Sequence, residues 1–309
     1  MNNHIDSVYI LGLGAMGSMY AGKLYDMSPD SVKIIAGRRR IKALTHSGIT
    51  INGKPYAFSY IEPGDHPQPP ASLIIIAVKS PQLGEAIRDI RSFIGRDTIV
   101  ISLLNGISSE EIIGGEIGVQ HLLYAYGIGM DAVREGYNVT YANTGRIVFG
   151  EKHNETVSGR VQAVKDLFDK AGISYEVPVN MEKAMWAKFM MNTGINQVSA
   201  VLRAPYGIFQ QEGEARRLML AASEEVLSLS RQIGIGLDIA DVKEFLRVLG
   251  SLHPSGKTSM LQDIEAGRKT EVDLFAGTVI QMGKKYNVST PVNETLYRII
   301  LSMEEMGQV

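Results

Sequence analysis

Three glycines that directly follow a short apolar run near the start of the chain constrain its fold more than any other feature. Residues 8–11 have the composition of a buried strand, and residues 18–25 have that of a helix. In such a strand–turn–helix, the first glycine allows a tight turn, the second lets the backbone approach a pyrophosphate, and the third lets the helix pack closely on the strand. The helix N-terminus adds amide donors and a positive dipole end. The pattern predicts a dinucleotide site formed by Gly12, Leu13, Gly14, Ala15, Met16 and Gly17. The alternative is a glycine-rich turn that serves packing alone.

The rest of the first half alternates strand-like and helix-like segments. Apolar, β-branched runs occupy residues 32–36, 73–78, 99–104, 121–126, 146–149 and 173–177, and helical composition occupies residues 83–93 and 158–171. Uninterrupted aliphatic runs are typical of parallel strands that are covered by helices on both faces. After Pro178, helical periodicity dominates in residues 181–202, 212–233, 238–249, 271–286 and 291–306. We expect a doubly wound α/β domain with a parallel sheet at residues 1–178 and an all-α domain at residues 179–309.

Composition and charge exclude several classes of protein. With 31 Lys and Arg against 33 Asp and Glu, the formal charge is −2, so we expect no nucleic-acid partner. The absence of cysteine excludes disulfides, thiolate zinc sites and a cysteine nucleophile, and we predict no metal site. The longest aliphatic run, residues 73–78, is far shorter than the roughly 18 residues that suggest a membrane span. The N-terminus lacks a signal-peptide pattern, so we expect a cytoplasmic protein without a membrane partner. The sequence permits a homodimer but leaves the oligomeric state open.

Basic and polar residues follow three of the predicted strands. The second strand ends in Gly37-Arg38-Arg39-Arg40. A carboxylate there would bind the ribose hydroxyls of NAD, whereas a guanidinium can hold the 2′-phosphate of NADP. We therefore predict NADP (NADPH) as cofactor, with Arg38 as its contact; the alternative is a solvated basic turn. Lys79 and Asn105 follow the next two strands, where ligands of open α/β sheets bind, and we expect Lys79 to meet cofactor or substrate anions and Asn105 the nicotinamide ribose.

The helix predicted at residues 185–202 is apolar around most of its circumference, but three polar residues interrupt it. Lys188, Asn192 and Asn196 stand at i, i+4 and i+8, within roughly 80° of arc. A polar stripe on a buried helix indicates a wet cavity, and partial desolvation lowers the pKa of a lysine toward that of an efficient general acid. The alternative is that Lys188 reaches solvent and the asparagines bind neighbouring backbone.

A second polar cluster spans residues 257–273. Ser259 is a candidate anchor for a carboxylate or hydroxyl group, and Glu271 a candidate partner for Lys188 or for a bound hydroxyl. Thr270 and Asp273 have the spacing of a capping box, so the alternative places Glu271 in the first turn of a helix, where it would only complement the helix dipole.

Together these motifs resemble the ketopantoate reductases (2-dehydropantoate 2-reductases). The similarity runs in order along nearly the whole chain through GLGAMG at 12–17, Arg38, VKSPQ at 78–82, LNG at 104–106, WAKFMMNTGINQVSAV at 186–201, SMLQDIEAGRKTEVD at 259–273 and TP at 290–291. The resemblance implies a Rossmann domain followed by a helical domain, and NADPH-dependent reduction of 2-dehydropantoate to (R)-pantoate in pantothenate and coenzyme A biosynthesis.

The resemblance also implies roles for individual residues. It makes Lys188 the catalytic lysine and Glu271 the residue that supports the lysine or the cofactor. It assigns substrate binding to Asn192, Asn196 and Ser259, and cofactor and active-site contacts to Lys79 and Asn105. One position departs from the family pattern, because Tyr206 stands where a substrate-binding asparagine is expected.

Three other functions remain open at the level of sequence. A β-hydroxyacid dehydrogenase shares the glycine turn, the arginine and a lysine with an asparagine four residues later, but has a glycine-rich substrate loop where this chain reads SLLNG. A reductase of another branched 2-oxo acid stays open because of Tyr206. A non-catalytic NADP-sensing module would have no need of Lys188.

Overall fold

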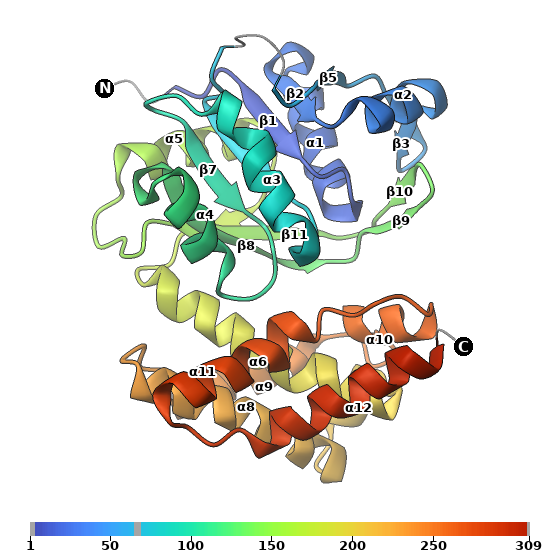
Figure 1. Cartoon of the computed structure of the whole chain (residues 1–309), viewed down its shortest axis with the longest axis vertical. Helices are drawn as coiled ribbons and strands as arrows, with labels where there is room; N and C mark the ends of the chain where they lie inside the picture. Colours follow the sequence, from blue (N-terminus) through green and yellow to red (C-terminus); the bar gives the residue numbers. More distant parts are fainter. Residues whose placement is uncertain (1–3, 65–68, 308–309) are drawn as a thin grey trace. The chain divides into compact units, whose positions relative to one another are not determined.

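The computed structural model describes residues 4–64 and 69–307, and it divides into two compact units. These units are Met1–Met181 and Glu182–Val309. Within the described residues, all strands belong to the first unit, and the second unit is helical (Figure 1). The predicted fold class, a Rossmann-type α/β domain followed by an all-α domain, is confirmed.

The first unit is built on a sheet of eight strands. They are β1 (Val8–Leu11), β2 (Val32–Ile35), β5 (Ser59–Ile61), β6 (Leu73–Ile76), β7 (Ile99–Ser102), β8 (Leu122–Met130), β11 (Thr144–Gly150) and β12 (Tyr175–Glu176). Their order is β12-β11-β8-β7-β6-β1-β2-β5, and all neighbours pair in parallel except β8 and β11. The chain runs outward from β1 first on one side and then, from β6, on the other. This reversal next to β1 is the place where doubly wound sheets bind ligands.

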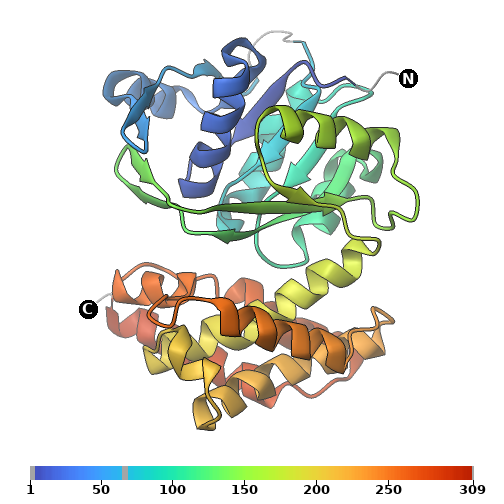
Figure 2. The ribbon, with the colours of Figure 1, turned by 180° about the vertical axis from the view of Figure 1, so that it is seen from behind.

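Helices cover both faces of the sheet because its strands are apolar on both sides. In β1, Val8 and Ile10 enter one core, with residues of α1 (Ala15–Met27) and α5 (Gly159–Lys170). These two helices lie in front of the sheet in Figure 2. Tyr9 and Leu11 enter the opposite core, with residues of α3 (Leu83–Ile90) and α4 (Ser109–Ile117), which lie in front of the sheet in Figure 1. Each strand is thus fixed by two packed layers, and the ends of the strands are left for ligands.

Several short elements were not predicted. Four three-residue strands form a separate sheet in the order β4-β3-β10-β9, namely β3 (Ile49–Ile51), β4 (Lys54–Tyr56), β9 (Val133–Glu135) and β10 (Asn138–Thr140). Such strands are too short for a periodic signal, although the Asn52-Gly53 turn, with φ of 48° and 78°, is a hairpin signature. Helix α2 (Arg38–Ser47) was not predicted either, and its first three residues are the arginines that we assigned to the end of the second strand.

The second unit consists of helices packed around a common core. They are α6 (Met181–Leu202), α7 (Tyr206–Gln210), α8 (Glu214–Gln232), α9 (Ile239–Ser251), α10 (Ser259–Glu265), α11 (Thr278–Tyr286) and α12 (Pro291–Gly307), with a π-helical turn η5 at Asp273–Gly277. Helix α6 crosses α8 closely at Gly194, where a Cβ atom would lie 2.1 Å from the Ser223 Oγ. This contact explains a glycine in the middle of a long helix.

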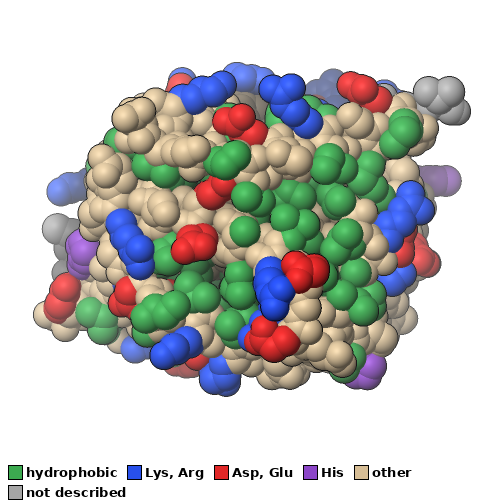
Figure 3. Space-filling view, turned by 90° about the horizontal axis from the view of Figure 1, so that it is seen from below, with side chains coloured by type: hydrophobic (Ala, Val, Ile, Leu, Met, Phe, Trp, Pro, Cys, Tyr) green, Lys and Arg blue, Asp and Glu red, His purple; other side chains and the backbone are tan. Residues whose placement is uncertain are grey.

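The surface agrees with the small net charge of the chain. On the face of the helical unit drawn in Figure 3, hydrophobic side chains lie between scattered acidic and basic ones. In the part of the chain that the structure describes, no helix combines the length and the apolar character needed to cross a bilayer.

A buried carboxylate holds three helices of the second unit together. Glu225 on α8 accepts hydrogen bonds from the backbone N–H groups of Val292 (2.7 Å) and Asn293 (3.0 Å), the second and third residues of α12. It also accepts one from the Asn293 Nδ2 (2.7 Å), and the Asn293 Oδ1 accepts one from Gln197 on α6 (2.9 Å). Glu225 therefore caps α12 from outside and, through Asn293, fixes it against the helix that carries Lys188.

We expect Glu225→Ala to lower the free energy of unfolding by about 2–4 kcal/mol, because it leaves the N–H groups of Val292 and Asn293, half-buried and buried respectively, without an acceptor. Urea denaturation measures the change. Glu224, the exposed neighbour on α8, supplies the matched control, and Glu224→Ala should stay within about 0.5 kcal/mol of wild type. Equal losses in the two variants would contradict the capping role.

Candidate active site

Two of the three glycines in the turn after β1 are required by the chain itself. Gly12 has a φ of +107°, and a Cβ atom there would lie 2.5 Å from the carbonyl oxygen of Ala77. A Cβ atom at Gly17 would lie 1.9 Å from the carbonyl oxygen of Gly12. These distances agree with the expected roles of a tight turn for Gly12 and close packing of α1 for Gly17.

Gly14 differs, because neither its conformation nor its neighbours require glycine. Its φ of −72° suits any residue, and the nearest described atom to an added Cβ would be the Ala77 oxygen at 3.9 Å. Gly14 is also the N-cap of α1, where none of the described side chains caps the helix. The space above Gly14 and the amide groups of Ala15, Met16 and Gly17 therefore form a cradle that suits a pyrophosphate.

The end of β2 presents a guanidinium with a carboxylate partner. Arg38 is the first residue of α2, and its Nε donates to the two carboxylate oxygens of Glu62 at 3.1 and 3.2 Å, while its Nη2 donates to Oε2 at 3.1 Å. Glu62 directly follows β5, the strand next to β2. Sequence reasoning missed Glu62 because no motif marks it, and only the strand order makes it a neighbour of Arg38.

The predicted cofactor residues of the first unit lie at one edge of its sheet, whereas Glu271 belongs to the second unit. Gly12 follows β1, Arg38 follows β2, Lys79 follows β6 and Asn105 follows β7. These four strands are parallel neighbours, so their carboxyl ends meet at the same edge. Lys79 is exposed and Asn105 is half-buried. The fold thus places these four residues at the edge of the sheet where doubly wound folds bind their ligands.

The predicted polar stripe lies on one continuous helix. Lys188, Asn192 and Asn196 all belong to α6 and share one face of it by their spacing. Lys188 and Asn192 are half-buried, and Asn196 is 6% exposed. Buried apolar residues of the same helix, such as Phe189 and Ile195, stand between them in the sequence, and α6 also carries the buried polar residues Thr193, Gln197 and Ser199.

The start of α10 is attached to the same helix. Thr258, its N-cap, accepts a hydrogen bond from the Leu261 N–H (3.2 Å) and donates one to the Ser199 Oγ on α6 (3.2 Å). Ser199 lies about one turn beyond Asn196, so Ser259, the first residue of α10, is held close to the end of the stripe. Ser259 is exposed. The structure therefore brings this predicted substrate residue to the helix that carries the lysine.

Glu271 does not lie in the first turn of a helix, which corrects one of our two interpretations. The capping box is not formed, because the Thr270 hydroxyl accepts from the Val272 N–H (3.2 Å) and donates to Glu304 on α12 (2.6 Å). Glu271 lies in a bend before η5, which begins at Asp273. Single π-helical turns occur often at functional sites.

Tyr206 packs against the loop that leads into α10. Its N–H donates to the carbonyl oxygen of Gly256 (2.9 Å), and a Cβ atom at Gly256 would lie 2.9 Å from the Tyr206 Cδ2. Burial raises the pKa of the Tyr206 phenol. The aromatic ring thus lies against Gly256, three residues before Ser259 along that loop.

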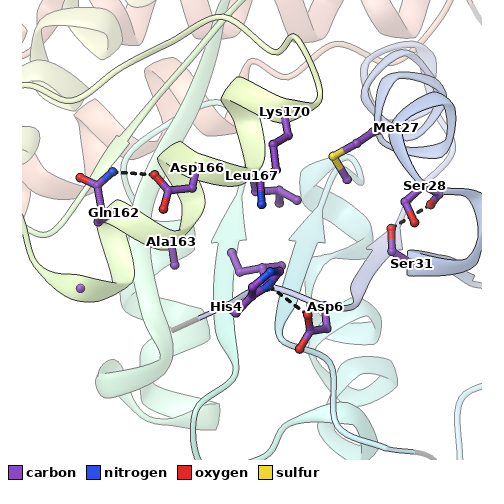
Figure 4. Close-up of a pocket in the computed structure, with 12 residues that line it drawn as sticks. His4, Asp6, Met27, Ser28, Ser31, Gln162, Ala163, Asp166, Leu167 and Lys170 are labelled. Atoms are coloured by element: carbon purple, nitrogen blue, oxygen red, sulfur yellow. Dashed lines mark hydrogen bonds and ion pairs between the residues drawn. The ribbon is translucent and has the colours of Figure 1, made fainter. Parts of the chain in front are cut away.

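A cavity in the first unit lies away from these residues. It is lined by residues such as His4 and Asp6 before β1, Met27 at the end of α1, and Asp166 and Lys170 on α5 (Figure 4). These residues mark the amino ends of the parallel strands, whereas the glycine turn lies at the carboxyl ends. Among the described residues, no group of His, Cys, Asp and Glu could hold a metal ion.

Two family models match successive parts of the chain. The model described as ketopantoate reductase PanE/ApbA matches residues 8–154, and the one described as ketopantoate reductase PanE/ApbA C terminal matches residues 180–304. Among curated proteins, 2-dehydropantoate 2-reductase of Pyrococcus horikoshii is 31% identical over 97% of this chain and 98% of its own length.

Solved structures share the fold of the chain. A D-mandelate dehydrogenase in complex with NADH and anilino(oxo)acetate has a TM-score of 0.86 at 23% identity, covering 98% of this chain and 100% of the other. A dimeric ketopantoate reductase from Staphylococcus aureus has a TM-score of 0.80 at 21% identity, covering 97% and 99%. At these identities the likeness shows the architecture alone.

Proposed function

Since the chain belongs to the ketopantoate reductase PanE/ApbA family of oxidoreductases, we propose that it reduces 2-dehydropantoate to (R)-pantoate with NADPH. The family predicted from the sequence motifs is thereby confirmed, and it favours this reaction over that of a β-hydroxyacid dehydrogenase. The observation that carries the proposal is the stripe of Lys188, Asn192 and Asn196 on one face of a continuous, largely buried helix. The (R)-pantoate formed would serve pantothenate and coenzyme A synthesis.

The first unit supplies the proposed cofactor site. The cradle over Gly14 and the uncapped start of α1 suit a pyrophosphate, and Arg38 suits an adenosine 2′-phosphate. Lys79 and Asn105 would add contacts from the ends of the neighbouring strands. When bound, a reduced nicotinamide supplies the hydride that such a reduction needs.

The second unit supplies the proposed acid and the substrate contacts. Lys188 donates a proton from its Nζ to the oxygen of the ketone as negative charge develops there, and its positive charge stabilises that oxygen. Asn192, Asn196 and Ser259 hold the carboxylate and hydroxyl groups of the substrate by hydrogen bonds. Glu271 orients the Lys188 ammonium, the cofactor or a substrate hydroxyl from the bend before η5.

Rates of NADPH and NADH oxidation with a panel of 2-oxo acids test this function. We expect the largest kcat/KM with NADPH and 2-dehydropantoate. A clear preference for another 2-oxo acid would show that 2-dehydropantoate is not the substrate, while the type of reaction would stand. Tyr206, which stands where the family has a substrate-binding asparagine, motivates this second candidate. No turnover with any acid would leave the non-catalytic NADP-sensing module as the function.

We also propose that the chain forms a homodimer, as the relative from Staphylococcus aureus does. Light scattering coupled to size-exclusion chromatography measures the mass directly. A mass near the 33.8 kDa of one chain would contradict the proposal.

A further inference from the structure

The guanidinium at the end of β2 is paired with a carboxylate from the neighbouring strand. Three hydrogen bonds of 3.1–3.2 Å join the Nε and Nη2 of Arg38 to the two oxygens of Glu62. The Arg38 side chain is 74% exposed and that of Glu62 only 22%. The pair uses the Nε–Nη2 edge of the guanidinium, so Nη1 is turned away from Glu62.

This pairing follows from the register of the sheet. Strands β2 and β5 are parallel with Ile35 opposite Ile61, and the Ala36 N–H donates to the Ile61 carbonyl oxygen at 3.1 Å. Arg38 and Glu62 therefore leave adjacent strands at the same edge. A carboxylate thus lies beside an arginine that suits NADP, but it follows β5 and not β2 itself.

The two charges act in opposite directions on the adenosine end of a cofactor. A 2′-phosphate carries a charge of about −1.5 to −2 at neutral pH, so it is attracted by Arg38 and repelled by Glu62. A cofactor without that phosphate carries no charge at this position, so neither of these electrostatic effects acts on it. We propose that Glu62 is a specificity-determining residue that weakens the preference of this protein for NADPH over NADH. This inference rests on the proposed dinucleotide site.

The variant Glu62→Gln tests the proposal, since it keeps an oxygen that can accept from Arg38 but removes the charge. Calorimetry should compare adenosine 2′,5′-bisphosphate with adenosine 5′-monophosphate as ligands of wild type and variant. We expect the variant to bind the bisphosphate about fivefold more tightly, and the monophosphate unchanged, as an exposed pair of charges would produce. The ratio of kcat/KM for NADPH to that for NADH should rise by a similar factor.

Glu176→Gln is the matched control. Glu176 on β12 pairs with Arg146 on β11 at 2.9 Å, and β12 is the outermost strand on the side of the sheet away from β2 and β5. This variant should therefore leave both affinities unchanged. In an Arg38→Ala background, Glu62→Gln should increase the affinity for the bisphosphate by a larger factor than it does in wild type. Without Arg38, no neighbouring positive charge offsets the negative charge of Glu62.

The outcomes separate this inference from the function it rests on. If wild type binds the bisphosphate and Glu62→Gln leaves the ratio of the two affinities unchanged, or shifts it toward the monophosphate, the role of Glu62 is wrong while the dinucleotide site stands. If wild type binds neither nucleotide, the dinucleotide site is wrong and the role of Glu62 falls with it.

Discussion

Replacing Lys188 by alanine should lower kcat by about 10²- to 10⁴-fold, while the affinity for NADPH stays close to that of wild type. The proposed proton donor and the positive charge beside the developing alkoxide are lost together, and both act in the transition state more than in the ground state. Because the glycine turn and Arg38, which are proposed to hold the pyrophosphate and the 2′-phosphate, lie in the first unit, binding should persist. Steady-state kinetics and a fluorescence titration with NADPH measure the two quantities.

Two further variants separate the roles of Lys188. Lys188→Arg keeps a positive charge but cannot release a proton at working pH, so we expect it to remain strongly impaired in kcat. Lys183→Ala is the control on the same helix, because Lys183 forms an ion pair with Asp241 (3.1 Å) at the start of α9, outside the stripe. Turnover near that of wild type in Lys188→Ala would remove the proposed proton donor.

The elements that the sequence predicted well are those whose pattern is local. The aliphatic run at residues 73–78 indicated a strand buried on both faces, and β6 has no exposed residue. Helix α6 begins and ends at Met181 and Leu202, as its periodicity predicted, so the stripe of Lys188, Asn192 and Asn196 could be placed on one helix face before any coordinates were known.

The features that the sequence did not predict depend on long-range contacts. Glu62 is a neighbour of Arg38 only because β5 adds to the sheet beside β2, and a three-residue strand leaves no periodic pattern. The position of Glu271 was ambiguous because the Thr270 hydroxyl could cap a helix or bind elsewhere. In the structure, Glu304, more than thirty residues later, accepts hydrogen bonds from both the N–H and the hydroxyl of Thr270, so Thr270 does not form the capping box.

The glycine turn allows packing and ligand binding to be tested separately. Gly17→Ala places a methyl group 1.9 Å from the Gly12 carbonyl oxygen, so α1 must move away from β1. We expect the free energy of unfolding to fall by about 3 kcal/mol or more, together with a loss of NADPH binding. Gly14→Ala meets no such contact, and its stability should stay within about 1 kcal/mol of wild type.

Gly14→Ala should nevertheless bind NADPH about 10- to 100-fold more weakly, because its methyl group fills the space that a pyrophosphate would occupy. That factor corresponds to the roughly 1–3 kcal/mol that one added methyl costs in a close-packed contact. Urea denaturation and an NADPH titration of both variants give the two numbers. A folded Gly14→Ala protein with wild-type affinity would contradict the cradle, since glycine at that position would then serve neither the chain nor a ligand.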